Sequence, residues 1–124
     1  TGTRRDLYKV YKEIDVAVHP SHSENLGGAA ESLAAAVPTI STNVGGFPDI
    51  VIDHETGFTV PAKNPVALSN AILKMLNDEN DACRMAKNGQ TLVRTMLDID
   101  NCVRNIDAIY KKIIGKKESE FVNG

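Results

Sequence analysis

Two carboxylates and two glycines carry the most informative chemistry in this sequence. Glu24 and Glu31 flank the pair Gly27 and Gly28, within the stretch 19–36. Glycine lets the backbone turn and approach a ligand closely. The N–H groups at the start of a helix carry the positive end of its dipole and bind phosphate. The spacing therefore predicts a phosphate-binding helix start with carboxylates beside it.

The two carboxylates require a different ligand group, because a carboxylate repels phosphate. A carboxylate only accepts hydrogen bonds, and the adjacent hydroxyls of a sugar donate them. We therefore expect Glu24 and Glu31 to face hydroxyl groups while the glycine backbone faces phosphate. A ligand with an anionic middle and hydroxylated ends, such as a nucleotide sugar, meets both requirements.

The elements around this stretch must place it at one edge of a sheet. The apolar run Ile14–Val18 is expected to be a strand buried on both faces, and Thr39–Thr42 is expected to be the next strand. We expect the helix between them to begin after Gly28. Strand, loop, helix and strand form the βαβ unit of a parallel sheet. In such sheets ligands bind beyond the carboxyl ends of the strands, where this loop lies.

The second half of the sequence has helical periodicity. Asn64 and Pro65 are a capping side chain followed by a first-turn proline, which marks a helix start. A second helix is expected over Asp81–Met96, with Gly89 in its interior, and a last one from Asp98 or Asp100. The apolar positions expected to face the core are Leu68, Ala71, Ile72, Met75 and Leu76, then Met85, Leu92, Val93 and Met96, then Val103, Ile106, Ile109 and Ile113. Near the start of the chain, Asp6 is expected to cap a short helix.

Four segments, in this order and spacing, resemble the donor-binding domain of retaining GT-B glycosyltransferases of family 4. These segments are Asp15–Ser21, Ser23–Ile40, Asn43–Val51 and Glu55–Pro61. The resemblance covers residues 1–114 and implies an α/β fold: a Rossmann-like parallel sheet with helices on both faces, part of the C-terminal domain of a GT-B fold. Residues 115–124 are expected to be a polar tail.

The resemblance also implies roles for single residues. The residue at Glu24 contacts hydroxyls of the donor sugar and is the catalytic candidate, and the residue at Glu31 holds the nucleotide ribose. The donor-binding set is Glu24, Asn25, Leu26, Gly27, Gly28 and Glu31. Within this set, the backbone of Leu26, Gly27 and Gly28 faces the diphosphate. The family usually has seven residues between its two glutamates, whereas this chain has six. The glycine pair is expected to absorb the difference before the helix starts.

The implied activity is transfer of a sugar from a nucleotide-diphosphate sugar to an acceptor, with retention of configuration. The family supplies an arginine and a lysine from a segment upstream of Thr1 and needs no bound metal or other cofactor. An N-terminal domain outside this chain would bind the acceptor, a sugar or a lipid, so we expect the chain alone to be inactive. Two alternatives remain open: a nucleotide-sugar epimerase of the same architecture, and a non-catalytic nucleotide-sugar-binding module. The base, the sugar and the acceptor are not assigned.

Read alone, residues 50–60 fit a β-hairpin. The resemblance favours a short helix to about Ile52 and then a strand, Phe58–Val60, and this is the reading we adopt.

Composition excludes several classes of function. The formal charge is −2 and no dense basic block occurs, so nucleic-acid binding is not expected. No apolar run reaches the length of a membrane span and no signal peptide opens the sequence. We expect a cytoplasmic location, with peripheral association at the inner membrane face as an alternative. Cys83 and Cys102 lack metal-ligand spacing and are expected to be reduced thiols.

The remaining polar candidates have structural explanations. His19, His22 and His54 do not have the spacing of a metal site. His19 is expected at a strand end, and His22 either lines a ligand pocket or lies in solvent. Ser32 is expected on the helix surface, and Gly46 is expected in a turn, with ligand contact as a weaker alternative.

Overall fold

The computed structural model of the chain describes residues 6–22, 26–96 and 99–122. It has two compact units, Thr1–Arg94 and Thr95–Gly124, which are considered separately below. The elements of the first unit are α1 (Leu7–Tyr11), β1 (Ala17–His19), α2 (Leu26–Ala34), β2 (Thr39–Thr42), α3 (Phe47–Ile50), β3 (Phe58–Val60), α4 (Pro65–Asn77) and α5 (Glu79–Met96). The second unit contains α6 (Ile99–Val122).

The three strands of the described residues form a parallel sheet in the order β1-β2-β3. Ile40 of β2 lies between Val18 of β1 and Phe58 of β3. The predicted α/β class and the strand Thr39–Thr42 are confirmed. The first strand is shorter than predicted: it spans Ala17–His19, and Val18 is only half-buried. Among the described strands β1 has one neighbour, so it is not covered as a central strand would be.

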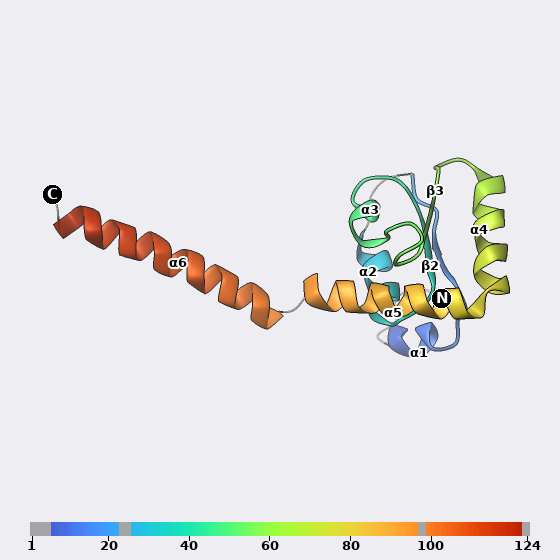
Figure 1. Ribbon diagram of the computed structural model, residues 1–124, viewed down its shortest axis with the longest axis horizontal. Helices are drawn as coiled ribbons and strands as arrows, with labels where there is room; N and C mark the ends of the chain where they lie inside the picture. Colours follow the sequence, from blue (N-terminus) through green and yellow to red (C-terminus); the bar gives the residue numbers. More distant parts are fainter. Residues whose placement is uncertain (1–5, 23–25, 97–98, 123–124) are drawn as a thin grey trace. The chain divides into compact units, whose positions relative to one another are not determined.

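The two faces of the sheet have different chemistry, because successive side chains of a strand point to opposite faces. Figure 1 shows α2 and α4 on opposite sides of the sheet. On the α4 side, Ile40 and Phe58 pack with Met75 of α4 and Met85 of α5. On the other side, Thr39 hydrogen-bonds to α2. The predicted arrangement, with helices on both faces of a parallel sheet, is therefore confirmed.

Helix α5 contributes to two separate clusters of the core. Its first half supplies residues to the cluster on the α4 side of the sheet, whereas Val93 packs with Leu33 of α2 and Phe47 of α3. Gly89 permits this close packing, because a Cβ there would lie 2.5 Å from Leu33 Cδ2 and 3.3 Å from the carbonyl oxygen of Thr56. The glycine in the middle of a helix therefore serves the contact between α5 and α2.

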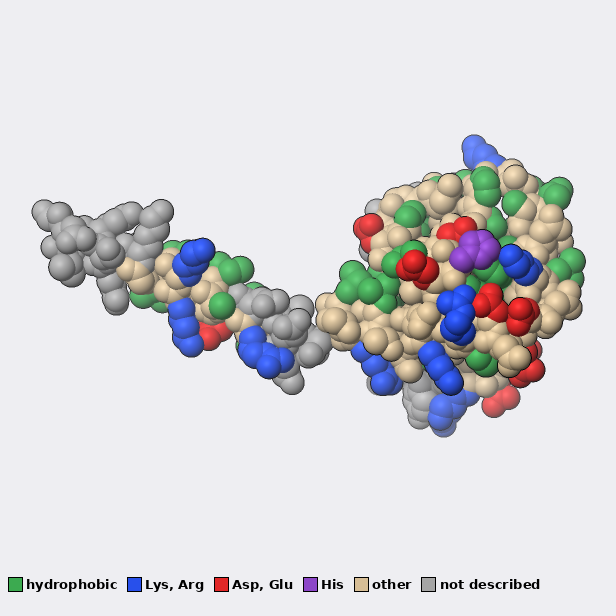
Figure 2. All heavy atoms as spheres, viewed as in Figure 1, with side chains coloured by type: hydrophobic (Ala, Val, Ile, Leu, Met, Phe, Trp, Pro, Cys, Tyr) green, Lys and Arg blue, Asp and Glu red, His purple; other side chains and the backbone are tan. Residues whose placement is uncertain are grey.

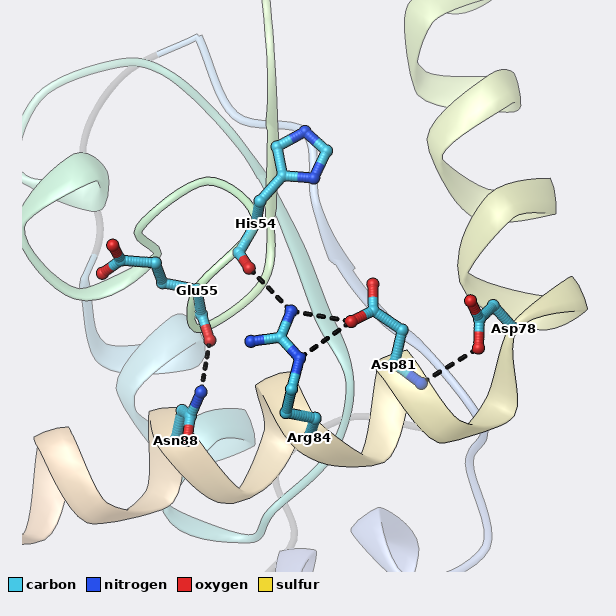
Figure 3. A network of polar contacts seen from close by, with 6 residues as sticks. All are labelled: His54, Glu55, Asp78, Asp81, Arg84 and Asn88. Atoms are coloured by element: carbon cyan, nitrogen blue, oxygen red, sulfur yellow. Dashed lines mark hydrogen bonds and ion pairs between the residues drawn. The ribbon is translucent and has the colours of Figure 1, made fainter.

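A polar network joins α5 to the loop that leads into β3 (Figure 3). The guanidinium of Arg84 donates to the carbonyl oxygen of His54 at 2.9 Å and to the carboxylate of Asp81 at 2.7 Å. The side-chain amide of Asn88 donates to the carbonyl oxygen of Glu55 at 3.0 Å. His54 has a φ of 63°, which few non-glycine residues adopt. The network satisfies backbone carbonyls of the loop at this conformation.

The predicted short helix and strand over residues 47–60 are confirmed as α3 and β3. Asp53 and Gly57 form a parallel bridge, so this segment is not an antiparallel hairpin. Gly57 lies directly against β2, and a Cβ there would approach the carbonyl oxygen of Thr39 to 2.3 Å. Only glycine lets the chain pass this point and join the sheet in parallel.

The structure confirms one predicted helix start and differs from the prediction at two others. Asn64 accepts a hydrogen bond from the N–H of Ala67 at 3.0 Å, which confirms it as the cap of α4. Asp6 precedes α1 without a side-chain capping bond to that helix. Helix α5 begins at Glu79, before the predicted Asp81. Leu76 was expected in the core but is 53% exposed.

Met96, also expected in the core, is largely exposed at the end of α5. Helix α6 runs to Val122, through residues expected to form a polar tail, while the domain boundary at residue 114 stays a prediction. Its apolar positions Val103, Ile106, Ile109 and Ile113 are exposed within the described part of the unit, and Figure 2 shows hydrophobic side chains along this helix. No helix in the described ranges combines the length and apolar character that crossing a bilayer requires.

Candidate functional site

The predicted ligand-binding stretch lies at the carboxyl end of β1, where α2 begins. Glu24 and Asn25 lie outside the described residues. Leu26, Gly27 and Gly28 form the first turn of α2 and not a loop before it. The prediction that the helix begins after Gly28 was wrong, so Gly27 and Gly28 do not form the loop that was expected to absorb the six-residue spacing.

The position of Gly28 in the first turn of α2 is explained by its contact with the side chain of His19. A Cβ at Gly28 would lie 3.2 Å from Cε1 and 3.3 Å from Nδ1 of His19. The glycine therefore lets the first turn of α2 rest on the imidazole ring at the end of β1. Glycine lowers helix propensity by about 1 kcal/mol relative to alanine, so this contact, and not local preference, explains its place in the turn.

His19 is the last residue of β1, as predicted, and it anchors a polar chain under α2. Its Nε2 lies 3.1 Å from Ser32 Oγ, which in turn lies 3.0 Å from Thr39 Oγ1. Ser32 is fully buried, so the prediction of a helix-surface role was wrong. It faces the sheet, and the buried hydroxyl takes its partners from β1, β2 and its own helix.

Hydrogen-bond counting assigns the tautomer of His19. The hydroxyl of Ser32 donates to the carbonyl oxygen of Ala29. Thr39 Oγ1 lies 2.8 Å from the carbonyl oxygen of Val37 and 3.0 Å from Ser32 Oγ, and its one hydrogen serves one of these two contacts. With the hydrogen of Ser32 directed to Ala29, we assign the tautomer of His19 in which Nε2–H donates to Ser32 Oγ. The neutral ring then carries a lone pair on Nδ1, at the edge that faces Gly28. Burial lowers the pKa of His19, and the nearby charge of Glu31 opposes this shift.

Glu31 lies on the exposed side of α2, one turn beyond the glycines. The first turn of α2 contains no acidic residue, and Glu31 lies beyond it. The effect of the helix dipole falls off within that turn. The hydroxyl of Tyr11, the last residue of α1, donates to Glu31 Oε2 at 3.2 Å. The site thus includes α1.

Tyr11 was not predicted to lie at the site, and Ser32 was expected on the helix surface. Tyr11 lies in α1, 20 positions before Glu31 in the sequence. Only the packing of α1 beside α2 brings them together. An available signal was the alternation in Thr39–Thr42, which places the Thr39 and Ser41 side chains on the face opposite Ile40.

Other predicted candidates have less direct relations to the stretch. His22 is exposed and borders a hollow of about 180 Å³ at the carboxyl ends of the strands. Gly46 precedes α3 as its N-cap, and Gly45 has a φ of 54°, so the predicted turn role is confirmed. Ser41, beside His19 in the sheet, is buried, and its hydroxyl has no hydrogen-bond partner within the described residues.

Charge and metal-ligand chemistry are modest across the described surface. Figure 2 shows acidic and basic side chains interspersed on the visible face of the Thr1–Arg94 unit. Within residues 6–22, 26–96 and 99–122, no three His, Cys, Asp or Glu side chains gather as a metal site would require. Cys83 is an exposed free thiol, and the side chain of Cys102 lies outside the described ones.

Known proteins match both the sequence and the fold. The capsular polysaccharide biosynthesis glycosyltransferase CapM of Staphylococcus aureus is 33% identical over 116 residues, which cover 93% of this chain and 30% of CapM. The C-terminal domain of LpcC from Francisella tularensis, a glycosyl transferase group 1 family protein, superposes with a TM-score of 0.69 at 28% identity. The match covers 77% of this chain and 49% of that domain.

A third likeness concerns the fold alone. HepE of Anabaena, in a crystal structure with UDP-glucose, superposes with a TM-score of 0.80 at 21% identity, over 90% of this chain and 31% of HepE. The chain therefore spans less than a third of CapM and of HepE. The predicted partial GT-B domain is confirmed. Residues 1–92 match the family described as Glycosyl transferases group 1, and the chain belongs to this family.

Proposed function

We propose that this chain binds the nucleotide-diphosphate sugar of a retaining glycosyltransferase at the carboxyl edge of its sheet. One observation carries the proposal: in a member of this family, the exposed carboxylate of Glu31 lies one turn beyond a helix start rich in glycine, at the end of a parallel strand. The helix start would face the diphosphate, Glu31 would accept hydrogen bonds from the ribose, and Glu24 would contact the transferred sugar. HepE, with UDP-glucose bound, gives the ligand class independent support.

The chemistry divides between this chain and segments outside it. Departure of a nucleoside diphosphate concentrates negative charge on phosphate oxygens, which fixed dipoles and cations must stabilise. The N–H groups of α2 supply dipoles. We propose that the arginine and lysine come from upstream of Thr1, without a metal or other cofactor, and that an N-terminal domain holds the sugar or lipid acceptor. In this proposal the full protein is a hexosyltransferase in the cytoplasm, and the chain alone binds without catalysis.

Titration of the ¹⁵N-labelled chain tests the placement. UDP, GDP and ADP should each be compared with the matching nucleoside, and the amide shifts followed. We expect the diphosphates to bind more tightly, because the helix start recognises phosphate, and the largest shifts to fall within residues 26–31. Shifts confined to other parts of the sheet, or equal affinity for nucleoside and diphosphate, would contradict the proposal.

Glu31→Ala tests ribose recognition within the same assay. Hydrogen bonds to a charged acceptor contribute about 1.5–3 kcal/mol each, so the affinity for the tightest diphosphate should fall about tenfold or more. The same variant should barely change the affinity for the 2′,3′-dideoxy analogue, which lacks the ribose hydroxyls. Glu55→Ala, at another exposed glutamate, controls for the loss of one negative charge. If the losses from mutation and analogue simply add, Glu31 does not bind the ribose.

A further inference from the structure

We propose that Tyr11 is a positioning residue of the donor site, which holds the Glu31 carboxylate in the orientation that accepts the ribose hydroxyls. The inference rests on the proposed function, because it concerns the same carboxylate. Among the described side chains, Tyr11 of α1 hydrogen-bonds to Glu31 of α2.

The hydrogen bond fixes one oxygen of the carboxylate and leaves the other available. The phenol donates to Oε2 at 3.2 Å, and Oε1 has no hydrogen bond within the described part of the chain. An ionised carboxylate has about four acceptor positions on its two oxygens. One donor at Oε2 therefore leaves room for two hydroxyls of a vicinal diol. The hydrogen bond from Tyr11 therefore leaves enough acceptor positions on the Glu31 carboxylate for the ligand.

Orientation matters because, among the described residues, Tyr11 is the hydrogen-bond partner of the Glu31 carboxylate. Its side chain is exposed on α2, and an exposed glutamate samples many rotamers that ligand binding must restrict. The half-buried ring of Tyr11 is a rigid support with few rotatable bonds. A carboxylate already held by the phenol loses less freedom when a ribose binds. This is preorganisation of a binding group by a neighbouring helix.

The electrostatics of the pair keep the donor in place at neutral pH. Burial, and then the charge and hydrogen bond of Glu31, raise the pKa of Tyr11 above its ordinary value of 10.0. The phenol therefore remains protonated and continues to donate. Among the described groups, His19 is the other one whose pKa responds to the charge of Glu31, but its Nε2 donates to Ser32. The carboxylate thus receives its hydrogen bond from Tyr11 and not from the imidazole.

Tyr11→Phe removes the hydroxyl and keeps the ring, so it separates positioning from packing. With the tightest-binding of UDP, GDP and ADP as probe, we expect the Kd of the full 124-residue chain to rise about three- to tenfold. The Kd of the 2′,3′-dideoxy analogue should change little, and the substitution should have no further effect in a Glu31→Gln background. Tyr110→Phe is the matched control, because Tyr110 is an exposed tyrosine of α6.

A measurement without ligand checks the contact itself. In the Glu31→Gln variant the pKa of Tyr11, followed through its ring ¹³C signals, should fall towards 10, because the charge that raises it is gone. An unchanged pKa would remove the contact on which the inference depends.

The binding outcomes are each decisive. An equal loss for the ribose and dideoxy ligands would assign the hydroxyl to the base or to folding, and overturn the inference. Tighter binding by Tyr11→Phe would make the phenol a competitor of the ribose, which also overturns it. If the unmodified chain binds none of the three diphosphates, the proposed function fails together with the inference. If it binds them and only the Tyr11→Phe difference is missing, the proposed function stands.

Discussion

At the scale of single residues, this end of the sheet depends on polar groups held between β1, β2 and α2. The buried hydroxyl of Ser32 has partners on three sides, and His19 is the one titratable group of that set. A chain of this kind is stable only when every member is satisfied, because an unpaired buried polar group costs about 1–3 kcal/mol. His19 must therefore stay neutral at Nδ1 and keep its proton at Nε2.

The lowered pKa of His19 predicts how stability depends on pH. In the folded chain the pKa lies below the ordinary value of 6.5, so the unfolded chain binds more protons in the window between the two values. The stability that His19 contributes is complete above about pH 6.5 and is lost as the pH falls through the folded-state pKa. Urea unfolding at a series of pH values from 8 to 5 should show this decrease.

Glutamine provides the variant that isolates this effect. The amide N–H₂ of His19→Gln can replace Nε2–H as the donor to Ser32, but it does not titrate. The decrease of unfolding free energy with falling pH should be smaller in this variant than in the native chain. If the free energy of unfolding depends on pH equally in the native chain and in His19→Gln, our account of the ring is contradicted.

Residue types alone could predict part of this arrangement. The position of His19 at a strand end follows from the apolar run before it and the proline after it. The burial of Ser32 could not be predicted, because serine is acceptable on a helix surface and its partners lie on two different strands. The bond between Tyr11 and Glu31 depends on the packing of two helices, which no local pattern specifies.

At the scale of elements, local signals sufficed wherever one segment determines its own structure. Thr39–Thr42 is a strand because three of its four residues are β-branched and a proline precedes it, and α4 starts at its capping asparagine. The start of α2 was predicted too late, because glycines normally disfavour a helix and the compensating contact with His19 lies on β1. Elements whose limits depend on a neighbour were therefore the ones misplaced.

Gly89 provides a test of that dependence on neighbours. Helix propensity alone favours Gly89→Ala by about 1 kcal/mol, yet the new Cβ would lie 2.5 Å from Leu33 Cδ2, a fully buried side chain. We expect the free energy of unfolding to fall by about 1–3 kcal/mol, because overpacking forces α5 and α2 apart.

Gly115→Ala is the matched substitution, in the interior of α6, where a Cβ would meet nothing within 4 Å. It should raise the helical circular dichroism signal or leave it unchanged. Denaturant unfolding of both variants decides the question. A Gly89→Ala chain more stable than the native one would show that propensity, and not the α5–α2 contact, governs this position.

At the scale of the whole molecule, the chain spans less than a third of the length of CapM. The two clusters of the first unit still share α5, which makes the carboxyl edge of the sheet part of one cooperative core. A ligand bound at that edge and only to the folded state must therefore stabilise the whole unit. This consequence is measurable without any reaction.

Thermal unfolding in the presence of ligand is the resulting prediction. At a concentration 100 times its Kd, a nucleoside diphosphate should stabilise the unit by about 2.7 kcal/mol. For a unit of this size, that free energy corresponds to a rise in Tm on the order of 10–20 °C. The rise should continue with the logarithm of ligand concentration, since binding draws the equilibrium to the folded state. Circular dichroism at increasing concentrations of the tightest of UDP, GDP and ADP provides the measurement.

Inorganic pyrophosphate at the same concentrations separates the site from general anion effects. It can occupy the start of α2 but offers no ribose to Glu31, so its rise in Tm should be clearly smaller. Glu31→Ala should reduce the rise with the nucleotide towards that with pyrophosphate, while the Tm without ligand changes little, because the Glu31 side chain is exposed. Equal rises with nucleotide and pyrophosphate in the native chain would mean that phosphate alone is recognised. In that case the ribose contact of Glu31, and with it the nucleotide specificity of this edge, would have to be abandoned.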